Sequence, residues 1–422
     1  MSRSSSVSFL LAAFLCSCAG TGASDDRLLV GAAAVDITPT LPVDPGDGTK
    51  PTPLYMAGFG TNRIAQGVHD PLWARAVVFE KRGRRAMLLS CDLVGLLHGR
   101  VLELAPKIDG DVIVCSTHCH SGPDVVGLWG PLPIISGVSP AYLKRLKEAL
   151  AEAARRALES RRPATLYAAE TRVEGVCKDI RPPDIRDEVA PSLVARDEAG
   201  RAIAVLVSFA MHPEGMSSKN RMISSDYPHY ERVALEREFP GAIAIHVSGD
   251  LGGMQTPDVK EHSWEEIRRC GETIAARVRE SQAMACAVSV PEVRVARAPV
   301  RFPLENKRFL AGFKSGLFGK DTEGVIDAEG EGFFLRSEVV AVRLGEVILV
   351  TIPGEALPEV GREILRLVDA PHKVLIGLGQ DEIGYILPKE DFDPKKYEES
   401  MSLGPQTAPT LLDALKKLLK GF

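Results

Sequence analysis

The 422-residue chain lacks the features that mark several large classes of protein. Its 51 Lys and Arg residues do not outnumber its 56 Asp and Glu residues, and this argues against nucleic acid as a main partner, because nucleic-acid-binding proteins usually carry a basic surplus. No run in the interior reaches the roughly 18 apolar residues that span a bilayer. With 45% apolar residues and a net charge of only −5, disorder is not expected either. The composition indicates an ordinary globular protein with a large core.

Cysteine is scarce and poorly spaced for disulfides or for metal binding. No Cys-x-x-Cys pair occurs, so a zinc site built from cysteines is not expected. Six cysteines lie beyond position 18, too dispersed for a disulfide framework. Cys91 and Cys115 lie in apolar runs, and we expect them to be small core residues.

The first residues have the pattern of an export signal. A short apolar run at 7–15 is followed at 15–18 by an aliphatic residue and small residues directly before a cysteine, as in bacterial lipoproteins. We expect residues 1–17 to be a signal peptide, Cys18 to carry lipid, and residues 18–28 to form a tether. This predicts an exported protein of the outer membrane or periplasm that contacts a membrane surface through its anchor. Secretion without an anchor is the alternative.

Runs rich in Val and Ile alternate with helical stretches, which is typical of an α/β protein. Several runs are apolar on both faces, as expected of strands buried in a sheet that helices cover. Helices are expected to begin at Ser139-Pro140 and, with a capping box, at Ser263. We therefore expect one domain over 29–422, with mixed β-sheets flanked by helices. The expected strands are 86–90, 112–116, 203–209, 242–247, 347–352 and 374–378.

Three further segments combine apolar residues with basic residues or with Gly and Pro. Residues 306–320 mix basic residues with phenylalanines, and the final segment from Thr410 reads as a helix of Leu and Lys. Either could lie on a membrane surface, although packing on the protein itself is commoner. The loop 125–138 is apolar but punctuated by Gly and Pro, and we expect it to form a wall or lid over a site.

Polar side chains follow four of the expected strands. Sites in α/β sheets form beyond the carboxyl ends of strands, so these side chains could converge. Imidazole and carboxylate are zinc ligands, and a catalytic zinc keeps one position for water. The metal lowers the pKa of that water and polarises a carbonyl, which makes hydrolysis possible near neutral pH. The side chains are His118 and His120, His212 and Glu214, Glu355, and Tyr385.

The His-x-His pair is the more specific part of this pattern. Alternate residues of an extended segment project to one side, so His118 and His120 can share a site while Cys119 points away. A single buried histidine, by contrast, is often satisfied by backbone groups and carries little weight.

Ten motifs, taken in order, give the chain a definite resemblance. From near Val30 to about Pro405 it resembles the neutral/alkaline, non-lysosomal ceramidase family. The sequence is identified as a divergent bacterial lipoprotein member that holds only the N-terminal catalytic domain, without the family's C-terminal immunoglobulin-like domain. The motifs lie at 30–39, 56–59, 67–76, 90–92, 117–123, 209–213, 223–226, 353–355, 384–385 and 397–405.

The resemblance implies one Zn²⁺ per chain and cleavage of the amide of ceramide into a sphingoid base and a fatty acid. His120 would lie beside the metal and orient or deprotonate the attacking water, or stabilise the oxyanion. Tyr397 falls where the family has a tyrosine that faces the substrate. The implied zinc ligands are His118, His212, Glu355 and Tyr385.

Three positions depart from the family's pattern or match it loosely. Thr256 takes the place of the family's catalytic serine only if one residue is inserted; otherwise Gln255 does. Glu214 is an additional carboxylate, either a base or partner at the site or a solvated loop charge. Arg181, which we also expect to be catalytic, is a loose match for the family's basic residue in the loop after the first helix.

Three functions therefore compete, two of them hydrolases and the third from another class. The first is a zinc-dependent amidohydrolase of ceramide or a similar N-acyl lipid, and the second is a zinc hydrolase of another amide or ester. The third is a lipoprotein that binds a lipid without turnover. A missing ligand would favour the third, but all four ligand positions are filled.

Overall fold

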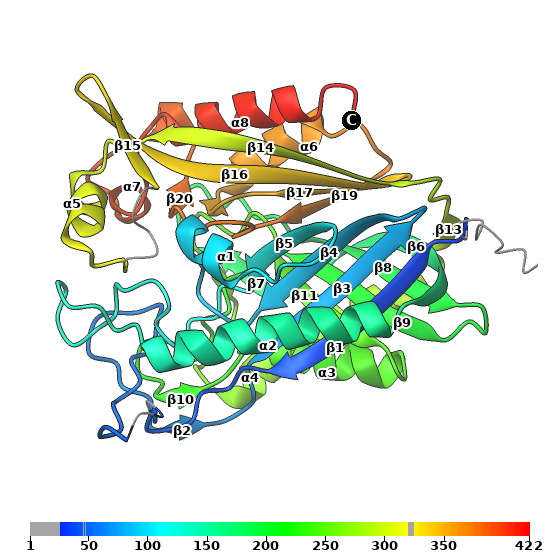
Figure 1. Cartoon of the computed structure of the whole chain (residues 1–422), viewed down its shortest axis with the longest axis horizontal. Coiled ribbons are helices and arrows are strands. Elements are labelled where there is room, and N and C mark those ends of the chain that lie inside the picture. Colours follow the sequence, from blue (N-terminus) through cyan, green and yellow to red (C-terminus); the bar gives the residue numbers. More distant parts are fainter. Residues whose placement is uncertain (1–25, 45, 47, 320–324) are drawn as a thin grey trace, which may run out of the picture.

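Two β-sheets stack face to face between two layers of helices (Figure 1). The computed structural model describes residues 26–44, 46, 48–319 and 325–422. The predicted signal peptide and Cys18 lie outside the described residues, as does most of the tether, so these stay predictions. Among the described residues, no helix is both long enough and apolar enough to cross a bilayer.

The larger sheet has the strand order β11-β9-β8-β6-β1-β3-β4-β5, with β13 paired to β6. Most neighbours are antiparallel, but β4 with β5 and β9 with β11 are parallel, so the sheet is mixed. The strands are β1 (Leu29–Asp36), β3 (Trp73–Lys81), β4 (Arg84–Cys91), β5 (Asp111–Ser116), β6 (Arg162–Arg172), β8 (Val189–Asp197), β9 (Ala202–Phe209), β11 (Ile243–Ser248) and β13 (Cys286–Val288).

The smaller sheet has the order β14-β16-β17-β19, with β15 paired to β16. Only its β17–β19 pair is parallel. Apolar residues of both sheets form the core between them, and Leu88, Leu206 and Leu349 are among its members. The strands are β14 (Val293–Pro303), β15 (Ile326–Glu329), β16 (Gly332–Leu344), β17 (Val347–Thr351) and β19 (His372–Ile376).

Helices cover the outer face of each sheet (Figure 1). On the larger sheet these are α2 (Pro140–Glu159), α3 (Tyr227–Glu238) and α4 (Trp264–Gln282). On the smaller sheet they are α6 (Pro358–Leu367) and α8 (Thr407–Leu418). The shorter helices are α1 (His98–Leu104), α5 (Lys307–Ser315), α7 (Tyr397–Ser400) and a 3₁₀ turn (Lys389–Asp391).

Three short strand pairs tie the loops together at the end of the molecule where the site lies. These pairs are β2 (Gly67–Val68) with β10 (Met222–Ile223), β7 (Cys177–Asp179) with β12 (Gln255–Pro257), and β18 (Glu355–Ala356) with β20 (Tyr385–Ile386).

The predicted fold class, mixed sheets flanked by helices, is confirmed. Each of the six expected strands is present, shifted by no more than two residues at either end. Ser139 and Ser263 cap α2 and α4 by accepting backbone N–H bonds. Glu266 instead accepts the backbone N–H of Lys260, so only half of the expected capping box forms. Cys91 and Cys115 are buried and unpaired, as expected of core residues.

Candidate metal centre

Loops from both sheets bring the polar side chains predicted from the sequence to one end of the sandwich. His118 and His120 follow β5, and His212 follows β9. Glu355 and Tyr385 begin β18 and β20, and they are direct neighbours in that parallel pair. β18 follows β17, and β20 follows β19, both strands of the smaller sheet. Their pairing places the Glu355 carboxylate opposite the histidines, which follow strands of the larger sheet.

Four ligand-type atoms lie close together, each within 3.3 Å of at least one other. Nε2 of His120 lies 3.0 Å from Nε2 of His118. One oxygen of Glu355, Oε2, lies 3.3 Å from Nε2 of His118 and 3.1 Å from Nε2 of His212. A tetrahedral zinc with ligand bonds of about 2.0–2.1 Å separates its ligand atoms by roughly 3.3 Å, so these spacings fit such an ion.

In each of the three histidines, the ring nitrogen that points away from the cluster, Nδ1, faces an acceptor. Nδ1 of His118 lies 2.6 Å from the carbonyl of Val94, and Nδ1 of His212 lies 2.9 Å from the carbonyl of Gln255. Nδ1 of His120 lies 3.3 Å from a carboxylate oxygen of Glu214. With a proton on each Nδ1, all three Nε2 atoms turn bare lone pairs toward the same point, which is how metal-binding histidines are oriented. The residues present therefore fit a cation.

The backbone around His118 and His120 is held in a defined conformation. His118 has a positive φ of 64°, which is uncommon for a residue with a side chain and occurs most often at functional sites. The Arg63 guanidinium donates to the carbonyls of Ala57 and His120. A side chain at Gly58 would come within 2.4 Å of the His120 ring, so that position needs glycine.

Glu214 and Thr256 lie on the outer side of His120. The Thr256 hydroxyl lies close enough to Glu214 to favour its ionised form. Burial opposes ionisation of Glu214, but its contacts with His120 and the nearby His212 outweigh this and lower the pKa of Glu214 to about 2. Burial also lowers the pKa of His120 to about 4. At neutral pH this makes an ionised carboxylate beside a neutral imidazole.

Thr256 and Gln255 are neighbours in β12, so their side chains point to opposite sides of the strand. The amide of Gln255 donates to the Asp250 carbonyl and accepts the backbone N–H of Asp187, away from the histidines. Thr256, the next residue of β12, points the opposite way, toward Glu214. The hydroxyl is thus the group that the structure brings to the cluster.

Sequence reasoning missed Glu382, a second carboxyl beside His118 and Glu355. The three side chains form a further group that could hold a metal ion. Burial and the charge of Glu355 raise the pKa of Glu382 well above its usual range. Its Oε2 has no hydrogen-bond partner among the described residues. The available signal was its place in the same loop as Tyr385, directly after an expected strand.

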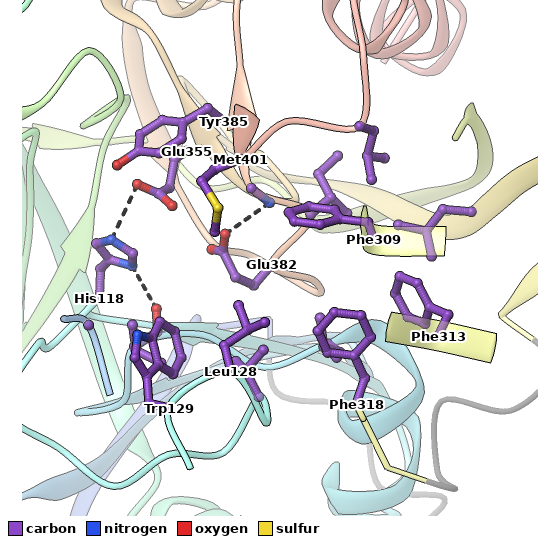
Figure 2. A pocket seen from close by; sticks show the side chains of 18 of the residues that line it. His118, Leu128, Trp129, Phe309, Phe313, Phe318, Glu355, Glu382, Tyr385 and Met401 are labelled. Atoms are coloured by element: carbon purple, nitrogen blue, oxygen red, sulfur yellow. Dashed lines mark hydrogen bonds and ion pairs between the residues drawn. The ribbon is translucent and has the colours of Figure 1, made fainter. Parts of the chain in front are cut away.

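An apolar cavity opens from the metal-ligand side chains toward α5 (Figure 2). His118, Glu355 and Tyr385 lie at one end, and Glu382 is in its wall. Its free space is about 80 Å³, enough for a narrow chain rather than a bulky group. Its apolar lining includes Leu128, Trp129, Phe309, Phe313, Phe318, Leu335 and Leu403.

Two tyrosines lie between the ligand cluster and the cavity. The hydroxyl of Tyr385 donates to Sδ of Met254 at 3.1 Å, and burial, with the charge of Glu355, raises the pKa of Tyr385. Tyr397 is 59% exposed at the rim, and its ring centroid is 6.1 Å from that of Tyr385. The structure thus places Tyr385 inside the site and Tyr397 at its entrance.

Arg181 contacts α7 rather than the histidine cluster. Its guanidinium donates to Glu398 at 3.0 Å and to Glu399 at 2.8 Å. Both carboxylates are buried, so the three charges hold the first turn of α7 in place. Because Tyr397 begins that turn, Arg181 is arranged to position Tyr397.

The loop 125–138 forms one wall of the cavity, as predicted. Leu128 and Trp129 face inward (Figure 2). The carboxylate of Asp124 accepts the backbone N–H groups of four residues of this loop, at 2.7 to 3.2 Å. The loop is therefore a fixed wall in this structure.

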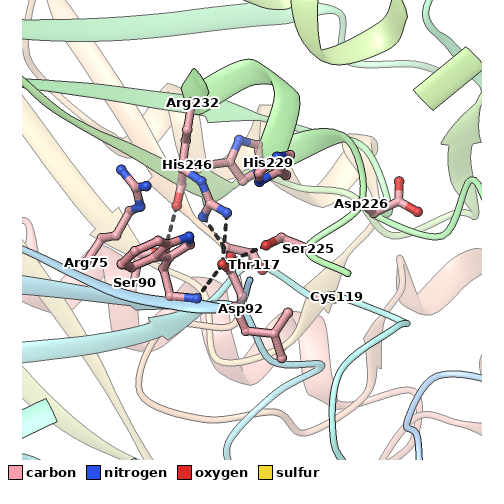
Figure 3. Close-up of polar contacts among 12 residues, drawn as sticks. Arg75, Ser90, Asp92, Thr117, Cys119, Ser225, Asp226, His229, Arg232 and His246 are labelled. Carbon is pink, nitrogen blue, oxygen red and sulfur yellow. Dashed lines mark hydrogen bonds and ion pairs between the residues drawn. The ribbon is translucent and has the colours of Figure 1, made fainter. Parts of the chain in front are cut away.

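A separate buried charge cluster lies behind the histidines (Figure 3). Asp92 accepts two hydrogen bonds from Arg232, at 2.7 and 2.8 Å. Its oxygens also accept from the Thr117 hydroxyl, the Ser225 hydroxyl and the Trp73 backbone N–H. Because Thr117 directly precedes His118, this cluster fixes the backbone that presents the first histidine.

Comparison with known proteins gives similarity to ceramidases in both sequence and fold. No protein-family model matches the chain. It is 25% identical over 266 residues to a neutral ceramidase of Mycobacterium tuberculosis, and 22% identical over 265 residues to one of Drosophila melanogaster. The crystal structure of neutral ceramidase from Pseudomonas aeruginosa superposes with a TM-score of 0.75 at 19% identity, over 94% of this chain and 75% of that one. A ceramidase complexed with C2 also has a TM-score of 0.75, at 17% identity.

The matches in sequence are partial. They cover 51% and 56% of this chain but only 41% and 35% of the Mycobacterium and Drosophila proteins. The chain thus spans about two fifths or less of the length of these curated relatives. The predicted resemblance to neutral ceramidases is confirmed, and the fold is theirs.

Proposed function

We propose that the protein is a zinc-dependent amidohydrolase that cleaves the N-acyl amide of ceramide or of a similar N-acyl lipid. The observation that carries the proposal is the meeting of His118, His120, His212 and Glu355 at the inner end of an apolar cavity. The polar end suits hydrolysis, and the apolar end suits an acyl chain. The similarity to neutral ceramidases, and to a ceramidase complexed with C2, supports the substrate class.

His118, His212 and Glu355 would hold the metal, and Tyr385 or His120 would supply a fourth protein donor. When bound, zinc polarises a carbonyl and lowers the pKa of water. We expect His120→Ala and Tyr385→Phe to separate the two candidates, because only the variant that removes a true donor weakens zinc binding. Zinc affinity by competition with a chromogenic chelator is the measurement.

The chain's own residues supply the proton chemistry. If Tyr385 rather than His120 is the fourth donor, the ionised carboxylate of Glu214 can take up the proton that the attacking water loses, with His120 as the relay between them. Water adds to the amide carbon, the C–N bond breaks, and the proton passes to the departing amine. Tyr397 at the rim is placed to contact the polar part of the substrate.

The first test is hydrolysis of a fluorescent short-chain ceramide by zinc-loaded protein, with a chelated control. Release of fatty acid that stops with chelator supports the proposal. No release from protein shown to hold zinc would reject ceramide as the substrate.

A second candidate is a zinc hydrolase of a different amide or ester. Glu382 favours it, because a buried carboxyl in the cavity wall with an unpartnered oxygen can bind a hydroxyl or amino group of a substrate. Assay of other N-acyl amides and of esters, with the same chelated control, separates the two. Zinc-loaded protein that binds lipid but cleaves none of them would indicate a lipid-binding lipoprotein instead.

A further inference from the structure

One compact group of large apolar side chains is exposed on the loop that walls the cavity. Leu132, Ile134 and Ile135 are 54%, 83% and 46% exposed and lie within residues 131–135, which we call the apolar tip. Met284, at 86%, is an exposed apolar side chain with no such neighbours in sequence. Contiguous exposed apolar side chains mark surfaces that contact proteins or lipids.

The tip is held away from the protein by its own backbone. The N–H of Ile135 donates to the carbonyl of Leu132 at 3.0 Å, which closes a turn. At the base of the tip, the N–H of Asn62 donates to the carbonyl of Gly130 at 2.8 Å. Together with the four N–H bonds to Asp124, these contacts prevent the tip from folding back to bury its side chains.

The tip is continuous with the cavity and adjoins a basic helix. Its own loop contributes Leu128 and Trp129 to the cavity wall. At Gly127 the loop packs so closely on the backbone just after α5 that a side chain there would come within 2.4 Å of the Leu317 carbonyl. Loop and α5 lie on the same side of the molecule, at the left of Figure 1.

Helix α5 has the charge that suits an anionic surface. Its three basic residues, Lys307, Arg308 and Lys314, are exposed, and the helix contains no acidic residue. On the inner side of the same helix, Phe309 and Phe313 line the cavity. Apolar side chains beside basic ones are the pattern of proteins that lie on anionic lipid bilayers.

We propose that the apolar tip and α5 form a docking surface for a bilayer that contains anionic phospholipids. The tip enters the acyl-chain boundary, and the basic residues of α5 contact the headgroup phosphates. The inference deepens the proposed function, because a docked bilayer lies next to the cavity that a lipid substrate would enter. A bilayer is favoured over a protein partner because the tip is a convex turn rather than a groove or flat face.

The test is sedimentation of the full chain with vesicles of phosphatidylcholine mixed with phosphatidylglycerol, or of phosphatidylcholine alone. A Cys18→Ser background removes any lipid at that position. Ile134→Ser/Ile135→Ser should weaken binding about tenfold or more, because burying one isoleucine side chain is worth at least that factor. The matched control Met284→Ser, between α4 and β13, should bind as the parent does. Lys307→Gln/Arg308→Gln should weaken binding only to the anionic vesicles.

Two outcomes overturn the proposal. The first is equal vesicle binding by the tip variant and its parent. The second is a parent that is dimeric by gel filtration and a tip variant that is monomeric with unchanged vesicle binding, which would make the tip an interface between copies. Binding is measured without substrate, so it stands apart from amide hydrolysis. If the proposed function holds, the tip variant keeps its rate on a water-soluble short-chain amide and loses rate only on substrate held in vesicles.

Discussion

Two buried polar clusters adjoin at residues 117–118, and they differ in how their atoms are satisfied. Around Asp92, every carboxylate oxygen meets donors, two of them from Arg232 (Figure 3). Around His118, by contrast, ring nitrogens and a carboxylate oxygen lie against one another (Figure 2). Buried polar atoms are normally paired, so the Asp92 carboxylate is satisfied by the protein alone, whereas the histidine cluster fits a cation. We call the group around Asp92 the complete cluster because both carboxylate oxygens are paired.

The largest expected effect is the difference in zinc content between a variant at His212, in the histidine cluster, and a variant at His246, in the region of the complete cluster. His212→Ala should reduce bound zinc from about one equivalent to background and lower kcat/KM by at least about 100-fold, since loss of a supporting partner alone can cost that much. His246, equally buried, contacts Glu231 at 2.8 Å in the region of the complete cluster. The control His246→Gln should keep its zinc. Full zinc content in folded His212→Ala would contradict the distinction between a metal-binding cluster and a cluster that binds no metal.

Breaking the complete cluster should cost stability rather than metal. Asp92→Leu leaves the Arg232 guanidinium buried without its counter-charge, and we expect a loss of about 3–5 kcal/mol in the free energy of unfolding. Urea denaturation followed by circular dichroism measures it. Asp92→Leu/Arg232→Met should regain part of that loss, because no charge is then stranded. A double variant no more stable than the single one would argue against the ion pair as the cause.

A third pair of variants tests the chemistry beside the metal. Glu214→Gln should lower kcat by about 100-fold while zinc content stays unchanged, because a general base contributes at least that factor. Thr256→Ala should lower kcat less, by about tenfold, since it removes only one hydrogen bond to Glu214. Steady-state kinetics with metal analysis on the same samples distinguishes a lost base from a lost ion. An unchanged rate in Glu214→Gln would remove it from the proton path.

Much of the fold and part of the site follow from local sequence patterns. The strands were predictable because Val- and Ile-rich runs buried on both faces leave little ambiguity, and His118, His120 and His212 follow such runs directly. The stacking of two sheets was not predictable, because it depends on residues that are far apart in sequence. Leu206 and Leu349, for example, belong to the same core between the sheets.

The rest of the site depends on distant contacts too. Glu382 belongs to it because the loop before β20 returns to His118, and no local pattern shows that return. Arg181 was expected to be catalytic, but its environment is decided by Glu398 and Glu399, more than 200 residues away. The pairing of β12 with β7 likewise determines whether Gln255 or Thr256 faces the cluster, and this pairing also joins distant parts of the chain.

Asp226 lies at the edge of the complete cluster but is not part of its pairing. Its φ is 61°, and its Oδ2 has no hydrogen-bond partner among the described residues. Burial raises the pKa of Asp226 to about 7, against roughly 3.9 in an unfolded chain. The folded protein therefore holds this proton between about pH 4 and pH 7, and stability falls as the pH rises through that window.

Asp226→Asn removes the titrating group but keeps an oxygen that can accept the Tyr227 N–H. Between pH 5 and pH 8 the wild type should lose about 2–3 kcal/mol of unfolding free energy relative to the variant. Urea denaturation at both pH values measures the difference, and the other titrating groups cancel because both proteins carry them. If the two pH profiles run parallel, Asp226 is ionised in the folded protein and must be paired as Asp92 is. The complete cluster would then extend to the N-terminal cap of α3, and the contrast with the histidine cluster would be sharper still.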